Sequence, residues 1–231
     1  MIELKNVRRI YKGVETGLYD ESAIIKKGEI VGILGENGSG KTTMLKAIMG
    51  LLELDHGEVL IGGKKVESQY EKMSFITEEG SYFPHMTGYE YGKFLQDFFP
   101  KFDNNRFREI FKLFHLDPYK KIKTFSTGQR AKVEIAAGFS KGAEYIIMDE
   151  PFMGSDMFTR RDFLKLMISS LRSKETILIS THLIDEIENF IDRAIILKFG
   201  KIKADFYIDD IRHKGKTLED MMIDIIGYKT I

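Results

Sequence analysis

The sequence predicts an α/β protein that has a mostly parallel sheet as its core and an inserted lobe of helices. A continuous apolar run at residues 30–34 leads into a glycine-rich loop and then into apolar residues at helical spacing. Strand-like runs at 145–148, 176–180 and 194–197 follow a stretch, 87–140, whose aromatic residues recur at helical spacing. Buried strands that alternate with helices pair in parallel, which is why we expect this core.

Composition and charge narrow the class of protein. The 231-residue chain has 35 Lys and Arg against 35 Asp and Glu, so no basic excess favours nucleic-acid binding. It has no cysteine, which excludes a disulfide scaffold, a thiol nucleophile and Cys-ligated metal sites. The first residues lack the apolar run of a signal peptide, and no segment approaches the roughly 18 apolar residues of a membrane span. We therefore expect a soluble, cytoplasmic protein without a nucleic-acid partner.

Short patterns predict the first elements. Apolar residues alternate at 2–7, and an apolar pair at 24–25 precedes a turn, which indicates two strands. The run at 30–34 reads as a strand buried on both faces. Apolar residues at helical spacing within 44–49 predict a helix, and Gly50 is placed to end it.

Proline residues separate the helices of the lobe. Pro100 and Pro118 interrupt the periodic segments, because proline lacks an N–H and restricts the residue before it. The stripes, expected to be mainly lobe core, are Tyr91, Phe94, Leu95, Phe98 and Phe99, then Phe107, Ile110, Phe111 and Phe114. Helices are also expected at 163–171, 185–190 and 218–226. With no repeat or linker, residues 1–231 read as one domain, in which 1–86 and 141–231 form the core and 87–140 the inserted lobe.

A glycine-rich segment that begins at Gly35 matches the phosphate-binding pattern G-x-x-x-x-G-K-[ST]. Its glycines let successive backbone N–H groups converge on phosphate oxygens, and Lys41 is expected to reach the β- and γ-phosphates. The Thr42 hydroxyl is expected to bind Mg²⁺, and the N-terminus of the next helix attracts negative charge. Its position between a strand and a helix disfavours the alternative, a flexible turn with an incidental lysine. The residues of this predicted phosphate loop are Gly35, Glu36, Asn37, Gly38, Ser39, Gly40, Lys41, Thr42 and Thr43.

Two carboxylates follow the strand predicted at 145–148. Ligands bind at the carboxyl ends of strands in open α/β sheets, so Asp149 is expected to be a second Mg²⁺ ligand. Glu150 is expected to polarise a water molecule for in-line attack on the γ-phosphate. Strands often end in acidic residues, so this pair indicates such chemistry only together with the phosphate loop.

A short motif carries a family resemblance. Phe125-Ser126-Thr127-Gly128-Gln129 resembles the Leu-Ser-Gly-Gly-Gln signature of the ATP-binding subunits of ABC transporters, and Gln129 lies 20 residues before Asp149. The resemblance covers essentially the whole chain. It implies a RecA-like P-loop NTPase core, an N-terminal antiparallel β subdomain and the helical lobe. Ser126 reads equally as an ordinary N-cap of a helix over 131–139.

The resemblance implies roles for further residues. In the family, the signature contacts the γ-phosphate of ATP bound to the other subunit, which implies that role for Ser126, Gly128 and Gln129. The segment 154–156 resembles the D-loop at the dimer interface, which implies that Asp156 contributes to the site.

Two single residues match the family by position. His182 resembles the switch histidine, which contacts the γ-phosphate and organises the catalytic glutamate and water. Tyr11 stands where the family has an aromatic residue that stacks on adenine. Taken alone, His182 reads as an exposed loop residue and Tyr11 as a core residue.

The chain departs from the family at three positions. Glu78 stands where the family usually has a glutamine that reaches the Mg²⁺ and the attacking water. Thr127 replaces the first glycine of the signature, and Lys132 replaces a usual arginine. We expect these departures to affect rate and coupling more than the capacity for hydrolysis.

The resemblance implies an ATPase that uses ATP and Mg²⁺, forms an ATP-sandwich dimer with a second copy, and powers transport through a separate membrane-spanning permease. Such a subunit lies on the inner face of the cell membrane, and residues 98–103 look most like two-component bacterial exporters. One alternative is a soluble ABC-type ATPase that acts on ribosomes or DNA, but the chain lacks tandem units and a long coiled coil. Another, a P-loop kinase or GTPase, is opposed by the signature and by the absence of Asn-Lys-x-Asp. The transported substrate does not follow from the sequence.

Overall fold

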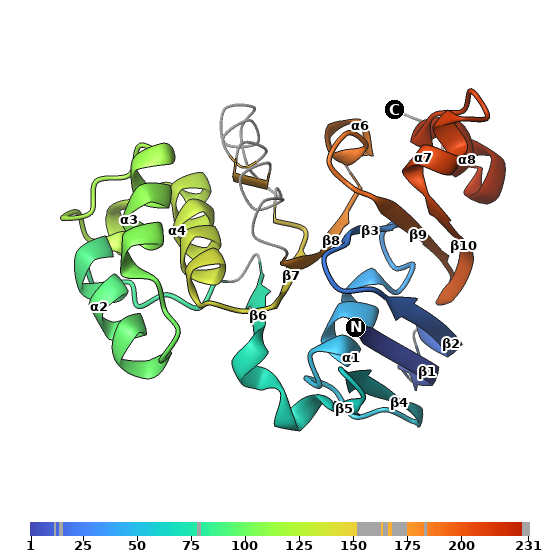
Figure 1. The fold of residues 1–231 in the computed structure, drawn as a ribbon, viewed down its shortest axis with the longest axis horizontal. Coiled ribbons are helices and arrows are strands. Elements are labelled where there is room, and N and C mark those ends of the chain that lie inside the picture. Colours follow the sequence, from blue (N-terminus) through green and yellow to red (C-terminus); the bar gives the residue numbers. More distant parts are fainter. Residues whose placement is uncertain are drawn as a thin grey trace. The chain divides into compact units, whose positions relative to one another are not determined.

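The computed structural model describes residues 1–11, 13, 16–77, 80–151, 163, 166–167, 175–182 and 184–227, with the backbone alone at 185 and 186. The chain forms two compact units, which can be followed by colour in Figure 1. Unit 1 comprises Met1–Tyr70 and Thr176–Ile231, and unit 2 comprises Glu71–Glu175.

Unit 1 contains an antiparallel sheet with the strand order β2-β1-β4-β5. Its strands are β1 (Ile2–Ile10), β2 (Gly17–Ile25), β4 (His56–Ile61) and β5 (Lys64–Lys65). The strand predicted from alternating apolar residues at 2–7 is confirmed, and its apolar residues Ile2, Leu4 and Val7 are buried. This sheet is the antiparallel β subdomain that the family resemblance implies. Neither β4 nor β5 was predicted, because the first half of β4 and all of β5 are exposed and show no alternation.

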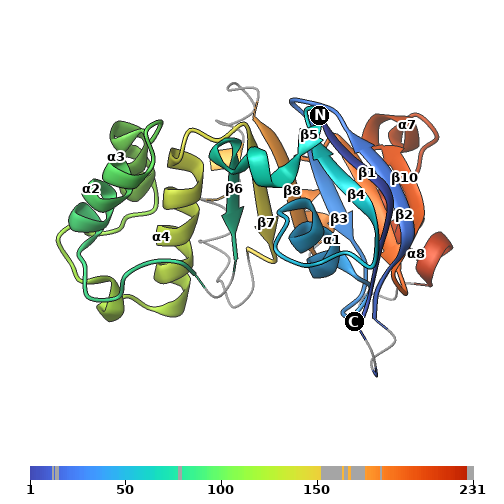
Figure 2. The ribbon, with the colours of Figure 1, turned by 90° about the horizontal axis from the view of Figure 1, so that it is seen from below.

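The second sheet of unit 1 is mostly parallel. Its strands are β3 (Ile30–Leu34), β8 (Thr176–Thr181), β9 (Arg193–Lys198) and β10 (Lys201–Tyr207). Strand β3 pairs in parallel with β8 and with β9, and β10 pairs antiparallel with β9. Every residue of β3 is buried, as its unbroken apolar sequence predicts. Helix α1 (Lys41–Ile48) contacts β1, β2 and β8 and lies between the two sheets (Figure 2).

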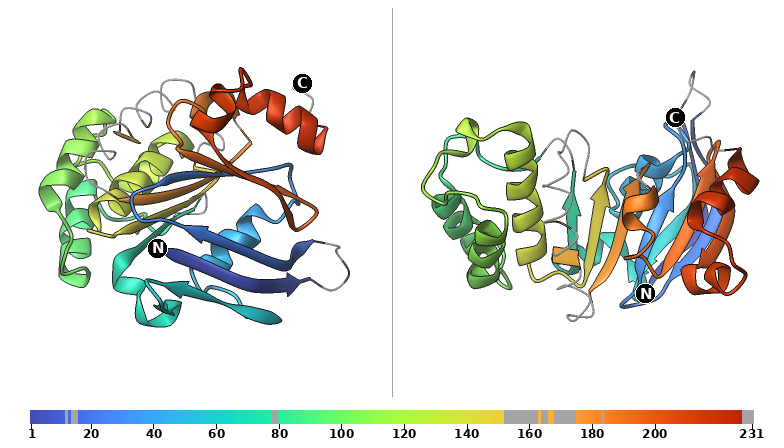
Figure 3. Two further views of the ribbon diagram at one scale, coloured as in Figure 1. Left: turned by 45° about the vertical axis from the view of Figure 1, so that its right-hand side comes forward. Right: turned by 90° about the horizontal axis from the view of Figure 1, so that it is seen from above.

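Three further helices of unit 1 are α6 (Ile184–Ile187), α7 (Ile208–Arg212) and α8 (Leu218–Ile226). Figure 3 shows α7 and α8 beside β10, which both contact. Helix α8 has the predicted bounds, whereas α6 is shorter than the acidic helix expected at 185–190, and α7 was not predicted. Single 3₁₀ turns lie at Val66–Ser68 and Tyr70–Lys72, and a third, in unit 2, lies at Ile122–Thr124.

Unit 2 contains the lobe helices and two parallel strands, β6 (Met73–Ile76) and β7 (Tyr145–Asp149). Three of its helices are α2 (Gly88–Phe98), α3 (Asn104–Leu113) and α4 (Thr127–Ser140), which contact one another. Helix α4 also packs against β6, where a Cβ atom on Gly138 would lie 2.4 Å from the Ile76 side chain. The predicted α/β fold with mostly parallel strands is confirmed. The division into a core and a lobe at 87–140 remains a prediction, because unit 2 also includes β6 and β7.

The aromatic stripes of the lobe are only partly core. Tyr91 and Leu95 of α2 and the predicted stripe of α3 with Phe114 are buried. Phe98, however, is 66% exposed, and its ring lies 4.5 Å from that of Phe94, which lies 4.7 Å from that of Phe83. The prediction of a mainly buried stripe is therefore wrong for the last turn of α2. Of the helix predicted at 163–171, only residues 163, 166 and 167 are described.

Candidate active site

The phosphate loop joins β3 to α1 in a backbone conformation that requires glycine. Gly35, Gly38 and Gly40 have φ angles of 150°, 79° and 107°, which L side chains rarely adopt. A Cβ atom on Gly35 would lie 2.3 Å from the carbonyl oxygen of Leu197, and one on Gly40 would lie 2.6 Å from that of Gly17. The loop is therefore packed closely against two other strands of unit 1.

Backbone hydrogen bonds fix the loop both internally and from a neighbouring turn. The Ser39 N–H donates to the carbonyl of Glu36 (3.1 Å), and the Gly200 N–H donates to that of Ser39 (2.9 Å). The Tyr19 N–H in turn donates to the Gly200 carbonyl (3.0 Å). The turn between β9 and β10 thus holds the loop, a role that no local pattern in the sequence reveals.

The charged end of Lys41 lies over the loop. This side chain is only 6% exposed, and its Nζ donates to the carbonyls of Gly35 (2.9 Å) and Glu36 (3.3 Å). The buried Ser39 hydroxyl has no hydrogen-bond partner among the described residues. A cation, an unpartnered hydroxyl and the N-terminus of α1 together fit the phosphate groups of a nucleotide.

Tyr11 is a surface residue at the end of β1. Its side chain is 37% exposed, and the Arg9 guanidinium lies 5.2 Å from its ring centroid. The Tyr11 N–H donates to the Thr16 carbonyl (3.2 Å), and the next residue, Gly17, lies beside the phosphate loop, where its carbonyl oxygen would be 2.6 Å from a Cβ atom on Gly40. Tyr11 therefore is not a core residue. The contact with Arg9 is an addition that the sequence did not predict.

His182 follows directly on β8. Thr181 pairs with Leu34 in the parallel ladder, so His182 leaves its strand at the same edge of the sheet as Gly35 leaves β3. The His182 side chain is exposed. Unit 1 thus contains the phosphate loop, Tyr11 and His182.

Unit 2 contains the two predicted carboxylates at the end of β7. Asp149 is the last residue of the strand, and both Asp149 and Glu150 are half-buried. Glu150 has a φ of 45° immediately before Pro151, a strained backbone conformation for a residue other than glycine. Such strain often accompanies functional residues. Glu150 lines a cavity of 230 Å³ together with Thr127, Arg130 and Glu134.

Mg²⁺ requires oxygen ligands, and the predicted ligands supply them. The Thr42 side chain is exposed in the first turn of α1, and Asp149 offers a half-buried carboxylate. Within the described ranges, no three His, Cys, Asp or Glu residues gather in a way that could hold a metal. Thr42 of unit 1 and Asp149 of unit 2 therefore each offer an oxygen ligand, and their joint binding of Mg²⁺ remains a prediction.

The signature segment caps α4. The Gln129 N–H donates to the Ser126 hydroxyl (3.2 Å), and the Ser126 N–H donates to the Gln129 side chain (3.0 Å). The expected N-cap is confirmed as a full capping box, and Ser126 stays exposed. Gly128 is half-buried in the first turn.

The structure gives a physical account of two departures from the family pattern. Arg130 donates to the Phe125 carbonyl (2.9 Å) and to the Thr127 hydroxyl (3.1 Å), so Thr127 is held by its own helix. Lys132 is buried, with its Nζ 5.5 Å from the centroid of the Phe114 ring. The other two predicted residues, Glu78 and Asp156, lie outside the described residues.

Similarity to known proteins identifies the family of this chain. The family model described as "ABC transporter" matches residues 18–153. The chain belongs to the ABC transporter ATP-binding family. It is 34% identical over 209 residues to an uncharacterized ABC transporter ATP-binding protein, YdbJ, of Bacillus subtilis, which covers 87% of this chain and 67% of that protein.

Solved structures of ABC cassettes have the same fold. One, an ATP-binding subunit of an ABC transporter, has a TM-score of 0.86 and 27% identity, covering 97% of this chain and 99% of that one. Another, a dimer of the cassette MJ0796 bound to ADP and Pi after hydrolysis, has a TM-score of 0.79 and 27% identity, covering 90% of this chain and 99% of that one. The predicted ABC-type ATPase is therefore confirmed, as is nucleotide binding. Among the described residues of this ABC ATPase, no helix is long and apolar enough to cross a bilayer.

Proposed function

We propose that this ABC ATPase hydrolyses MgATP as one half of a two-chain ATP sandwich and thereby powers a separate membrane-spanning permease. One observation carries the proposal: the chain has one phosphate loop and one signature, and the Ser126 cap of the signature is exposed on a helix N-terminus. An exposed N-terminus of α4 can receive the phosphate of a nucleotide bound to another copy.

The proposed division of roles follows the chemistry of phosphoryl transfer. The loop from Gly35 to Thr43, with Lys41, binds the phosphates, and Tyr11 stacks on the adenine. Asp149, Thr42 and Glu78 would hold Mg²⁺, which would neutralise charge on the phosphate oxygens. Glu150 orients the attacking water. The residues proposed to contact the γ-phosphate or complete the site from the interface are His182, Ser126, Gly128, Gln129 and Asp156.

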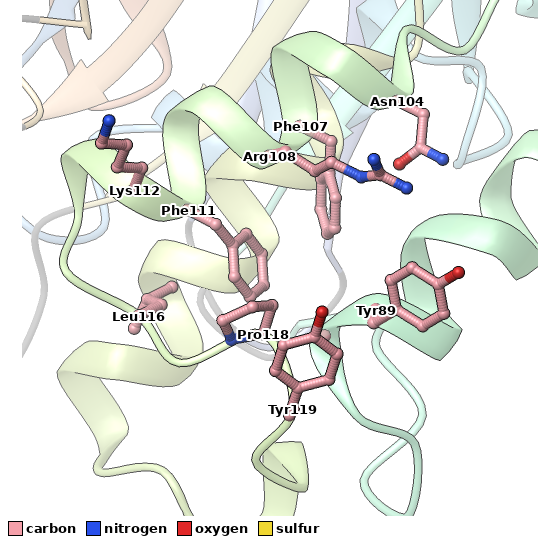
Figure 4. A pocket seen from close by; sticks show the side chains of 10 residues that line it. Tyr89, Asn104, Phe107, Arg108, Phe111, Lys112, Leu116, Pro118 and Tyr119 are labelled. Carbon is pink, nitrogen blue, oxygen red and sulfur yellow. The ribbon is translucent and has the colours of Figure 1, made fainter.

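We further propose that the permease docks on unit 2 at a cavity of 350 Å³ between α2, α3 and the loop that follows α3 (Figure 4). The buried side chains of Phe107, Phe111 and Leu116 form its apolar lining. Tyr89 and Tyr119 stand at its mouth, with ring centroids 6.0 Å apart. An apolar side chain of a permease helix fits such a lining.

The charge at this cavity favours an acidic partner. Arg108 and Lys112 line it, no carboxylate does, and neither cation forms an ion pair with any described residue. Arg108 instead lies over the Tyr89 ring at 5.6 Å. A permease segment that combines an apolar anchor with an Asp or Glu would complement both features.

Affinity purification from detergent-solubilised membranes of the source cell tests the proposed function. We expect a polytopic membrane protein to copurify with the wild type but not with the Arg108→Glu/Lys112→Glu double variant. Lys64→Glu, a change at an exposed position of β5 in unit 1, serves as the matched control and should retain the partner. Recovery of ribosomal proteins or DNA instead would favour the non-transport alternative. Such a permease would place the chain on the inner face of the membrane.

A further inference from the structure

Glu134 is a buried carboxylate on α4 that holds a residue far away in the sequence. It is 3% exposed. Its Oε2 accepts a hydrogen bond from the Ser81 N–H (2.9 Å), and its Oε1 accepts one from the Ser81 hydroxyl (2.8 Å). Both oxygens of one carboxylate therefore fix the position of a single residue.

The two sides of this contact differ in burial: Ser81 is exposed, whereas Glu134 and its neighbours on the helices are buried. Tyr91 of α2 is buried nearby, and its pKa is raised, first by burial and then by the negative charge of Glu134, while a hydrogen bond with Ser81 acts the other way. Burial lowers the pKa of Lys141, and Glu134 opposes that shift. Ser81 thus lies between α4 and α2. A buried carboxylate is costly unless hydrogen bonds compensate it, and here the compensation comes from Ser81.

Ser81 and Glu134 connect two segments that the proposed function uses. Ser81 comes three residues after Glu78 in the sequence, and Glu134 comes eight residues after the Ser126 cap on the same helix, about 12 Å along its axis. The segment that follows Ser81 is also hydrogen-bonded to the residues that precede the signature. The Lys123 N–H, two residues before Phe125, donates to the Pro84 carbonyl (2.8 Å).

We propose that Glu134 is a positioning residue that ties the segment at Ser81 to the signature helix α4, so that a displacement of one segment moves the other. The inference rests on the proposed function, in which Glu78 and Ser126 act at ATP. An apolar residue would fill the position of Glu134 at a lower desolvation cost, but it could not fix the orientation of the Ser81 N–H and O–H groups. The carboxylate therefore provides alignment as well as packing.

Double-mutant kinetics on the full chain test this role. We expect Glu134→Ala to lower kcat for ATP about tenfold, equivalent to about 1.4 kcal/mol, with KM unchanged, because the phosphate loop lies in the other unit. Ser81→Ala, which keeps its N–H bond, should lower kcat less. The double variant should be no slower than Glu134→Ala, since both changes break one link. Ser81→Thr, which keeps the hydroxyl, should retain wild-type kcat.

Ser140→Ala is the matched control. Ser140 lies on the same helix and is fully buried, and its hydroxyl has no hydrogen-bond partner among the described residues. This variant should keep wild-type kcat.

Thermal unfolding of every variant separates a loss of fold from a loss of alignment. The kcat of Glu134→Gln, which keeps the volume and one acceptor, should fall between those of the wild type and Glu134→Ala.

Hydrogen exchange of the Ser81 amide measures the contact without hydrolysis. Faster exchange in Glu134→Ala than in wild type supports the inference, and equal exchange overturns it. Wild-type kcat in Glu134→Ala, or strictly additive losses in the double variant, would also overturn it. These results differ from a failure of the proposed function, which would appear as a wild-type protein that neither hydrolyses ATP nor dimerises with it.

Discussion

Leu34 of β3 pairs with Thr181 of β8 in a parallel ladder. Because parallel strands leave their sheet at one edge, Gly35 and His182 begin their loops side by side at the carboxyl end of the sheet. Ligands of open α/β sheets bind at this edge. The pairing explains how two residues far apart in the sequence can serve one nucleotide, although the contact of His182 with the γ-phosphate remains a prediction.

Gly40→Ala should weaken ATP binding by at least about tenfold, because the added Cβ would collide with the Gly17 carbonyl and the φ of 107° costs about 1–3 kcal/mol for alanine. Isothermal titration with ATP measures the change. Gly62→Ala provides the control: its φ is 59°, but no atom lies within 4 Å of the added Cβ. Equal ATP affinity for wild type and Gly40→Ala would show that the loop accommodates the added Cβ atom and that its close packing is not required for ATP binding.

Tyr11→Ala should weaken ATP and GTP alike by about 1–3 kcal/mol, the scale of stacking between a base and an aromatic ring. A ring face reads no hydrogen-bond pattern, so selectivity between the two nucleotides should not change. Tyr11→Phe keeps the ring and should bind as the wild type does. Fluorescent nucleotide competition measures these affinities, and an unchanged affinity in Tyr11→Ala would remove Tyr11 from the site.

Ser126→Arg should block ATP-dependent dimerisation while leaving ATP binding to the monomer intact, because it places bulk and charge where the phosphate of the second chain must lie. The change also removes a helix cap, which costs about 0.5–2 kcal/mol of stability. Thr217→Arg removes an equivalent capping box from α8 and is the control for this loss. Light scattering in the presence of ATP measures the oligomeric state. A normal dimer in Ser126→Arg would contradict the proposed role of the signature.

Glu78→Gln should raise the free Mg²⁺ needed for half-maximal ATPase rate and strengthen the binding of metal-free ATP. The glutamate adds a negative charge that favours Mg²⁺ but repels the γ-phosphate, an effect that grows as water leaves the site. Mg²⁺ titration of the ATPase rate and ATP binding in EDTA measure both effects. Superimposable curves for the two proteins would place Glu78 outside the metal site.

The sequence was sufficient for features that local pattern controls. The buried strand β3, the Ser126 cap of α4 and the end of α1 before Gly50 follow from an apolar run, a capping serine and a glycine with a φ of 63°. The phosphate loop was predictable for the same reason, since its glycines and Lys41 are contiguous. Helix α4 itself begins at Thr127, four residues before the helix expected over 131–139.

Features that depend on distant partners were not predictable. Gly200 donates a hydrogen bond to the Ser39 carbonyl of the phosphate loop, and Ser81 binds Glu134, which is 53 residues away in the sequence. No short sequence pattern includes both members of either pair. The exposure of Phe98 was missed because helical spacing locates a stripe but not how far the neighbouring helices cover it. The Thr127 departure also gained its explanation, Arg130, only from the structure.

Glu150→Gln in the full chain tests the central claim, an ATP sandwich with a catalytic glutamate, most directly. The isosteric amide preserves the backbone at this strained position but cannot polarise water as the carboxylate does. In sedimentation velocity with MgATP, the account predicts that the variant is a dimer with ATP and a monomer without it, and that it hydrolyses ATP at a small fraction of the wild-type rate. Wild-type hydrolysis by the variant, or an oligomeric state indifferent to ATP, would contradict the account.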